Sequence, residues 1–129
     1  MLRILVIDDE KDFTEIIRKH FAQMGGAVDA AFTGRDGLKM LGENVPDAVV
    51  VDNKLPDMLG VEVVKRIREI NSDIPILMVS VDRREDLEAA LKPFHVDRYV
   101  KKPFRFADLY DAVLDVVGAS IKRKKGRSL

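Results

Sequence analysis

The chain has 129 residues, enough for one domain with a hydrophobic core, and its content of 47% hydrophobic and 34% charged residues is typical of a globular protein. It contains no cysteine, which excludes disulfides, thiol catalysis and cysteine-ligated zinc. There is no run of about 18 apolar residues and no signal-peptide pattern, so we expect a cytoplasmic protein that does not associate with membranes.

The formal net charge of zero hides an uneven distribution of charge along the chain. Residues 121–129 contain five of the 22 basic residues and no acidic residue, which leaves 17 basic against 22 acidic residues in the rest of the chain. Because this remainder is acidic, we expect no direct nucleic-acid binding by the domain. We assign residues 1–119 to one domain and residues 120–129 to a basic C-terminal tail or linker stump.

Apolar runs alternate with segments of helical spacing along the whole domain. Strands are predicted at 2–7, 27–31, 48–52, 75–80 and 97–100. Helices are predicted at 11–24, from Thr33-Gly34 to before Pro46, and at 60–71, 83–91 and 104–118. The fourth helix offers few apolar side chains for burial, namely Leu87, Ala90 and Leu91.

This alternation predicts the fold class. Strands that are apolar on both faces suit a parallel sheet covered by helices, and short connections imply right-handed crossovers. We therefore expect an α/β protein with a single doubly wound (βα)5 domain. In the flavodoxin-like arrangement its five-stranded parallel sheet has the order 2-1-3-4-5.

Polar side chains follow four of the predicted strands. Asp8 and Asp9 follow the first strand, Asp52 ends the third, Ser80 ends the fourth, and Lys102 lies just beyond the fifth. Because parallel strands end at one edge of a sheet, we expect these five side chains to converge. Two carboxylates about 4 Å apart repel by about 4 kcal/mol at an effective dielectric near 20, so the cluster needs cations.

The residue types at this edge indicate the chemistry. Lys102 supplies one positive charge, and an all-oxygen site favours Mg²⁺ over zinc. A carboxylate at Asp52 beside a metal, an ammonium group and the Ser80 hydroxyl is equipped to accept a phosphoryl group. Each residue also has a structural explanation, because Asp52 could be a turn former, Ser80 a helix cap and Lys102 a surface charge.

Together these motifs resemble the receiver domain of two-component response regulators. The resemblance covers about residues 2–118 and rests on the segment 4–10, the spacing Asp52…Pro56…Gly60, the apolar strand ending at Ser80, and the segment 99–104. It implies phosphorelay signal transduction rather than a dedicated enzyme, in a protein that catalyses its own phosphorylation and dephosphorylation.

The resemblance also assigns roles to the acidic cluster. Asp52 would be the phosphoacceptor, served by a sensor histidine kinase or phosphotransfer protein, with Lys102 beside it. Asp9 and Asp52 would bind Mg²⁺ directly, together with the backbone carbonyl of Lys54. Asp8 would contact the metal through water.

Signal output would depend on two further residues. Ser80 and Tyr99 would form the switch, and the surface of the fourth helix, fifth strand and fifth helix would carry the response and allow a homodimer. The family also commonly has a cis bond at Lys102-Pro103. The chain departs from the family pattern at Val81, where a small residue is usual, and at 93–96, where small residues and glycine are usual.

Three alternatives stay open at this point. A pseudo-receiver would signal by protein contacts without phosphorylation. A metal-dependent phosphatase of the haloacid-dehalogenase type would need a second aspartate at the position of Lys54. A nucleotide-binding fold would need a glycine-rich loop after the first strand, where the chain has Asp8-Asp9-Glu10.

Overall fold

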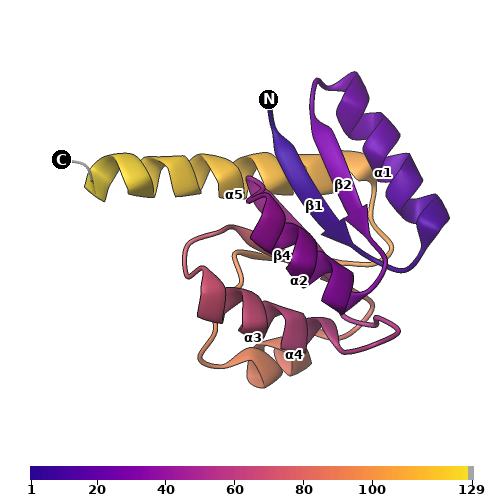
Figure 1. Ribbon diagram of the computed structural model, residues 1–129, viewed down its shortest axis with the longest axis vertical. Helices are drawn as coiled ribbons and strands as arrows, with labels where there is room; N and C mark the ends of the chain where they lie inside the picture. Colours follow the sequence, from indigo (N-terminus) through magenta and orange to yellow (C-terminus); the bar gives the residue numbers. More distant parts are fainter. Residues whose placement is uncertain (128–129) are drawn as a thin grey trace.

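The computed structural model describes residues 1–127 and alternates five strands with five helices (Figure 1). The elements are β1 (Arg3–Ile7), α1 (Lys11–Gln23), β2 (Ala27–Ala31), α2 (Gly34–Glu43), β3 (Ala48–Asp52), α3 (Gly60–Ile70), β4 (Ile76–Ser80), α4 (Arg84–Leu91), β5 (Arg98–Lys101) and α5 (Phe106–Arg127). Each strand and each helix lies where the sequence pattern predicts one, except that α5 is longer.

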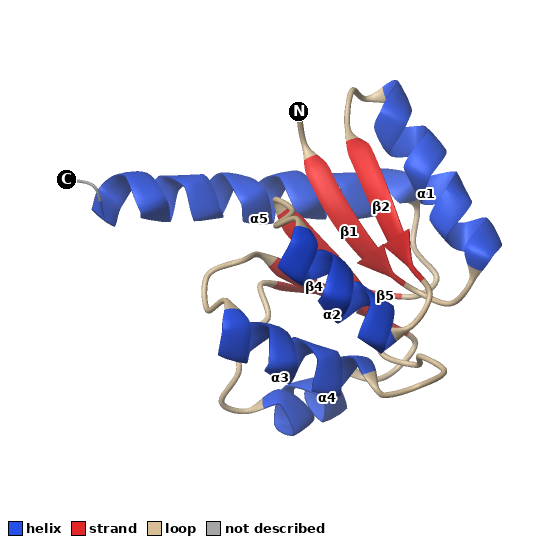
Figure 2. Ribbon diagram, in the orientation of Figure 1, coloured by secondary structure: helices blue, strands red, loops and turns tan. Residues whose placement is uncertain are grey.

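The strands form one parallel sheet with the order β2-β1-β3-β4-β5. Figure 2 shows β1 and β2 side by side in this sheet. The register pairs Ile7 with Val51, Asp52 with Val79, and Ser80 with Lys101. The carboxyl ends of β1, β3, β4 and β5 therefore reach the same edge of the sheet. The predicted fold class and strand order are confirmed.

Two hydrophobic cores cover the two faces of the sheet. Ile4 and Val6 of β1 pack with Phe21 of α1 and with α5, whereas Leu5 and Ile7 belong to the core formed with α2, α3 and α4. This division follows from the strand geometry, because successive side chains point to opposite faces. All five residues of β3 and of β4 are buried, as expected for strands covered on both sides.

Helix α5 is the main departure from the expected secondary structure. The sequence predicted its end at Gly118, because glycine inside a helix costs about 1 kcal/mol relative to alanine, but the helix begins at Phe106 and continues to Arg127. Arg123 and Arg127 on the added turns form ion pairs with Asp97 and Asp73 at 3.9 and 3.1 Å. These tertiary contacts stabilise the extension. Residues 120–127 of the expected tail are thus helical, and 128–129 lie outside the described residues.

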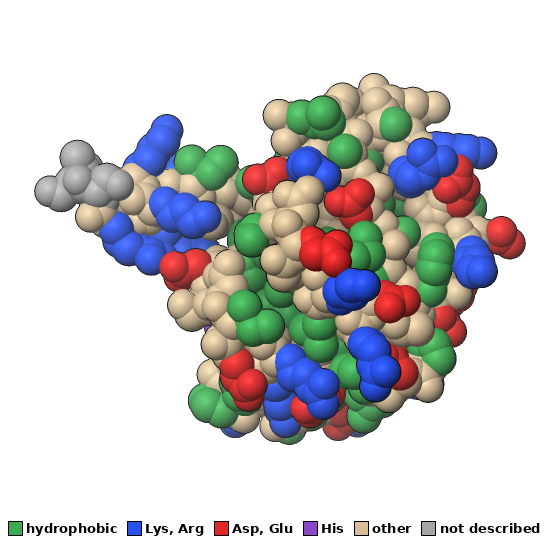
Figure 3. Space-filling view, viewed as in Figure 1, with side chains coloured by type: hydrophobic (Ala, Val, Ile, Leu, Met, Phe, Trp, Pro, Cys, Tyr) green, Lys and Arg blue, Asp and Glu red, His purple; other side chains and the backbone are tan. Residues whose placement is uncertain are grey.

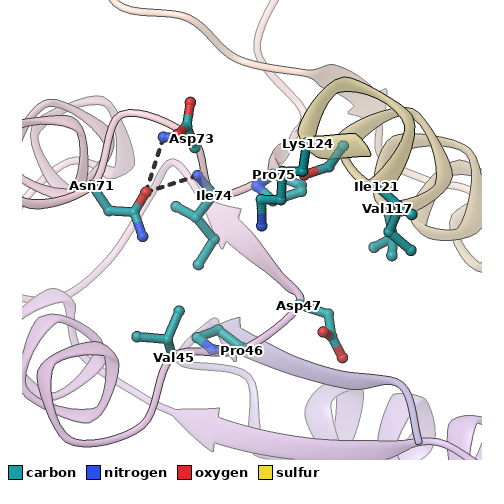
Figure 4. A pocket seen from close by; sticks show the side chains of 11 residues that line it. Val45, Pro46, Asp47, Asn71, Asp73, Ile74, Pro75, Val117, Ile121 and Lys124 are labelled. Atoms are coloured by element: carbon teal, nitrogen blue, oxygen red, sulfur yellow. Dashed lines mark hydrogen bonds between the residues drawn. The ribbon is translucent and has the colours of Figure 1, made fainter. Parts of the chain in front are cut away.

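The extension of α5 projects past the sheet and carries basic side chains at its end (Figures 1 and 3). Beside it lies a hollow of about 250 Å³ between α5 and the loops that precede β3 and β4 (Figure 4). In its wall, Asn71 Oδ1 accepts hydrogen bonds from the backbone N–H groups of Asp73 and Ile74. Neither α5 nor any other helix within residues 1–127 is long and apolar enough to cross a membrane.

A buried ion pair joins α3 to the starts of β4 and β5. The side chains of Arg68 and Asp97 are 6% and 7% exposed and lie 3.2 Å apart. Arg68 also donates to the carbonyls of Ile74 at 2.7 Å and His95 at 2.9 Å, and Asp97 accepts from the N–H of Ile76 at 2.8 Å. Burial lowers the pKa of Arg68 against the opposing effect of Asp97. Because each charge has several partners, we expect the pair to stabilise this edge.

Removing one member of the pair should destabilise the folded protein. We expect Arg68→Met to lower the free energy of unfolding by about 3–5 kcal/mol, because Asp97 is then left buried without its main partner. Arg66→Met on the same helix is the matched control. Arg66 is exposed and pairs with Glu62, so its loss should cost less than about 1 kcal/mol. Urea unfolding measures both, and equal losses in the two variants would contradict this assignment.

Candidate functional site

The three predicted acidic residues meet at the carboxyl edge of the sheet. One carboxylate oxygen from each of Asp8, Asp9 and Asp52 lies within 4.8 Å of the others. Asp9 and Asp52 line a cavity of about 280 Å³ together with Ser80, Lys102 and Lys54. The convergence expected from the strand ends is therefore confirmed. An all-oxygen, strongly acidic group of this kind fits a hard divalent cation.

Lys102 lies among these carboxylates. Its Nζ is 3.1 Å from Asp8 Oδ2, 3.6 Å from Asp52 Oδ1 and 3.7 Å from Glu10 Oε1. Burial by itself would lower the pKa of Lys102, but the hydrogen bond to Asp8 and the nearby negative charges outweigh it and raise that pKa. Lys102 therefore supplies a positive charge beside these carboxylates. Its Nζ also lies 4.8 Å from the ring centroid of Phe13.

Asp8 and Asp9 differ in their surroundings although they are neighbours in sequence. Asp8 is 2% exposed, and its Oδ1 accepts a hydrogen bond from the N–H of Glu10 at 2.9 Å while its Oδ2 accepts from Lys102. Asp9 is exposed at the mouth of the cavity. Hydrogen bonds within the protein therefore already engage both oxygens of the Asp8 carboxylate, whereas the Asp9 carboxylate is open to an approaching cation.

Asp52 is nearly buried, at 8% exposure, and this changes its acidity. Burial raises its pKa to about 6, Lys102 opposes the shift, and the charges of Asp8 and Asp9 add to it. The carboxylate is thus held in a poorly solvated position beside other negative charges. A bound cation would relieve this repulsion, so metal binding and ionisation of Asp52 should favour each other.

The turn after β3 depends on Gly60 and Asn53. A Cβ atom at Gly60 would collide with the backbone carbonyl of Asp52, so glycine is required where α3 begins. The N–H of Gly60 donates to the Asn53 carbonyl at 2.7 Å, and the N–H of Val61 donates to Asn53 Oδ1 at 3.1 Å. Between them the chain loops out from Lys54, which pairs with Leu59 in an isolated bridge. This turn positions both Asp52 and Lys54 beside the cavity.

The sequence did not single out Asp82, which lies directly beside Ser80. Ser80 Oγ donates to Asp82 Oδ2 at 2.8 Å, and the Asp82 N–H donates back to Ser80 Oγ at 3.0 Å. Asn53 Nδ2 donates to the same Asp82 Oδ2 at 2.9 Å. The hydrogen bonds from Asn53 and then Ser80 lower the pKa of Asp82. A signal was present, since an aspartate two residues after a serine commonly forms a local hydrogen-bonded turn.

Tyr99 lies on the neighbouring strand, away from the acidic cluster. Its half-buried ring has the Arg84 guanidinium 5.2 Å from its centroid, and burial raises the pKa of its hydroxyl. A second cavity of about 130 Å³ is lined by Ser80, Asp82, Arg84 and Tyr99, among others. The two residues that the resemblance paired as a switch thus border one cavity.

The departures from the family pattern lie on the two sides of helix α4. Leu87 and Leu91 are buried as expected, but Ala90 is exposed, which corrects that part of the prediction. Val81 is 54% exposed and lines the acidic cavity. Within residues 1–127 the bonds Lys92-Pro93 and Lys102-Pro103 are cis, and the second was expected.

Comparisons with known proteins agree with this geometry. Residues 4–114 match the family model of the response regulator receiver domain. The chain is 33% identical over 108 residues to response regulator MprA of Mycolicibacterium vanbaalenii, covering 84% of this chain and 47% of that protein. It is 34% identical over 108 residues to transcriptional regulatory protein DltR of Streptococcus agalactiae, covering 84% and 48%. The chain thus spans about half the length of these relatives.

Solved structures of response regulators have a similar fold. Response regulator TrrA of Thermotoga maritima, in complex with Mg²⁺-BeF, is 31% identical with a TM-score of 0.79, covering 90% of this chain and 99% of that one. A CheY-like receiver domain from Methanospirillum hungatei has a TM-score of 0.90 at 23% identity, covering 95% and 98%. The second similarity supports the fold.

The burial of Asp52 gives a test that needs no ligand. A carboxyl group with a raised pKa binds its proton more tightly in the folded state, so stability falls as pH rises from about 4 to 6, and the full penalty remains above pH 6. Without divalent metal, Asp52→Asn should therefore raise the free energy of unfolding by about 1–3 kcal/mol near pH 7.5. The gain should shrink toward zero below about pH 4.

Urea unfolding at several pH values measures this gain. The matched control is Asp111→Asn on the exposed side of α5, which should show no comparable gain. A gain for Asp52→Asn that is equally large at about pH 4 and pH 7.5 would rule out burial of the charge as its cause.

Proposed function

This chain belongs to the response regulator receiver domain family, and we propose that it is a Mg²⁺-dependent phosphoacceptor that takes a phosphoryl group from a histidine kinase or phosphotransfer protein onto Asp52. A receiver domain is a signalling module rather than a dedicated enzyme. One observation carries the proposal: the Asp52 carboxylate lies in the acidic cluster and 3.6 Å from Lys102 Nζ.

Mg²⁺ is the cofactor that this donor set fits best. Asp9, Asp52 and the backbone carbonyl of Lys54 would bind it directly, and Asp8 would contact it through water. The exposed Asp9 carboxylate and the internally bonded Asp8 carboxylate support this division of roles. When bound, the metal supplies positive charge that stabilises the transferring phosphoryl oxygens. The relative TrrA, solved in complex with Mg²⁺-BeF, supports the same choice.

The residues present account for the transfer itself. An Asp52 carboxylate oxygen attacks phosphorus while the bond from phosphorus to the donor histidine nitrogen breaks, and that nitrogen keeps the bonding electrons. The ammonium group of Lys102 contacts one phosphoryl oxygen and neutralises its charge, and the hydroxyl of Ser80 can donate a hydrogen bond to another. The cavity beside Asp52 leaves room for the donor's side chain.

The output would leave through α4, β5 and α5. When Ser80 turns toward the phosphoryl group, Tyr99 can move into the cavity that both residues border. Helix α4 is held by two buried leucines, so it should move more readily than the other helices. This surface could bind a partner or form a homodimer, and residues 120–129 could serve as a linker to a further domain.

A pseudo-receiver that signals without phosphorylation is the alternative. It would give no reason for Asp8, Asp9, Asp52, Ser80 and Lys102 to surround one small region. Phosphorylation explains each of these positions, so we favour it.

Intact-mass measurement after incubation with acetyl phosphate and Mg²⁺ tests the proposal. The wild-type protein should gain one phosphoryl group, because Asp52 is the one aspartate of the cluster that both lies near Lys102 and lines the cavity. Asp52→Asn should gain none, while the control Asp111→Asn should behave as wild type. Full phosphorylation of Asp52→Asn would move the acceptor elsewhere, and no modification of any variant would favour the pseudo-receiver.

Metal binding should depend most on Asp9. We expect Asp9→Ala to weaken Mg²⁺ binding at least about tenfold, since a direct ligand charge is lost. The same change relieves repulsion in the cluster, so the metal-free variant should be as stable as wild type or more stable. Calorimetric titration and urea unfolding measure the two effects, with exposed Asp12→Ala on α1 as control. Unchanged Mg²⁺ affinity in Asp9→Ala would refute this ligand assignment.

A further inference from the structure

The hydroxyl of Ser80 is already occupied in this structure. Ser80 is 3% exposed and donates its proton to Asp82 Oδ2 at 2.8 Å, while its oxygen accepts from the Asp82 N–H. A serine hydroxyl has one proton to donate. A phosphoryl oxygen on Asp52 could therefore receive it only after the bond to Asp82 breaks.

We propose that Asp82 is a positioning residue that holds Ser80 in its unphosphorylated orientation and so opposes the switch. This inference rests on the function proposed above, in which Ser80 turns toward a phosphoryl group on Asp52. Asp82 itself contacts neither the acid cluster nor Lys102 in any described interaction of residues 1–127. It acts through Ser80.

The carboxylate of Asp82 is well placed to compete for the proton. An ionised acceptor forms a stronger hydrogen bond than a neutral one. Asn53 fixes its position, because Asn53 Nδ2 donates to Asp82 while Asn53 Oδ1 accepts from the N–H of Val61 at the start of α3. The three side chains Ser80, Asp82 and Asn53, here called the Asp82 network, thus join the ends of β3 and β4.

The same loop also contacts the second switch residue. Arg84, two residues after Asp82, is the first residue of α4 and lies against the Tyr99 ring. Its Nε donates to Glu88 Oε1 at 2.5 Å, which holds the guanidinium along the helix. Ser80 and Tyr99 are therefore both contacted by the segment 82–84. Release of Asp82 would loosen the start of the helix that is expected to move.

Thermodynamic linkage makes this role measurable. If Asp82 favours the state with Ser80 turned away, then Asp82 must weaken binding of any ligand that favours the state with Ser80 turned inward. A phosphoryl mimic at Asp52 is such a ligand. Asp82 favours the resting orientation of Ser80 by some factor. Removing Asp82 should tighten binding of the phosphoryl mimic by that same factor.

Beryllofluoride with saturating Mg²⁺ is the probe, titrated by calorimetry into wild type, Asp82→Ala, Ser80→Ala and the double variant. We expect Asp82→Ala to tighten beryllofluoride binding by about five- to fiftyfold, within the usual range of coupling between sites. In the Ser80→Ala background the same substitution should change affinity by less than about twofold, because the proton for which the two sites compete is gone.

This cycle separates hydrogen bonding from simple loss of negative charge. Asp86→Ala removes an exposed carboxylate from the first turn of α4 and should leave affinity within about twofold of wild type. Asp82→Asn keeps an acceptor oxygen and the side-chain volume, so its affinity should fall between those of wild type and Asp82→Ala. It also serves as the folded variant if alanine disrupts the loop.

The outcomes are distinct. Equal tightening with and without the Ser80 hydroxyl would show that Asp82 acts by charge alone, and unchanged affinity in Asp82→Ala and Asp82→Asn would show that it does not act; either result overturns the inference. If affinity is unchanged in both Asp82 variants but the wild-type protein still binds beryllofluoride, the proposed function remains intact. Wild-type protein that binds none overturns both.

Discussion

The crowding of carboxylates around one ammonium group is the constraint on which the rest of the site depends. Asp8, Asp52 and Glu10 all lie within 3.7 Å of Lys102 Nζ, and Asp9 adds another negative charge. One cation cannot neutralise this group, and burial raises the pKa of the Asp52 carboxyl group. The cluster thus carries more negative than positive charge, which favours binding of a divalent cation.

The two edges of the sheet use ion pairs differently. At the amino edge, the Arg68 guanidinium and the Asp97 carboxylate neutralise each other and are surrounded by backbone hydrogen bonds. That pair is balanced in charge, and we expect it to contribute to stability. At the carboxyl edge the charges are unequal, and part of the cluster faces a cavity. The cluster with excess negative charge therefore lies at the carboxyl edge, where open α/β sheets bind their ligands.

Short side-chain contacts connect the reactive edge to the surface expected to move. Asn53 follows Asp52 directly and reaches Asp82 on the next loop, and Asp82 in turn occupies the Ser80 hydroxyl. Two residues later Arg84 begins α4 and lies against Tyr99. The path from β3 to α4 therefore runs through the side chains of Asn53, Asp82 and Arg84.

Much of this protein could be predicted from its sequence, because the relevant signals are local. Unbroken apolar strands alternating with helical spacing determined the fold class, and one parallel sheet brings Asp8, Asp9, Asp52, Ser80 and Lys102 to one edge whatever the details of packing. The motifs around these residues were enough to identify the family. Boundaries that depend on local turn chemistry, such as the start of α3 at Gly60, were also predictable.

Contacts between residues distant in sequence were decided by the tertiary structure alone. Gly118 favoured the end of a helix, but α5 continues beyond it, where Arg123 and Arg127 form ion pairs with Asp97 and Asp73. Helix propensity depends on residue type alone, so it does not include partners more than 25 residues away. The Asn53–Asp82 hydrogen bond and the approach of Glu10 to Lys102 are equally nonlocal. Residue types and spacing determine which groups reach the site. Their hydrogen-bond partners there depend on distances of a few tenths of an ångström, which only the packed fold sets.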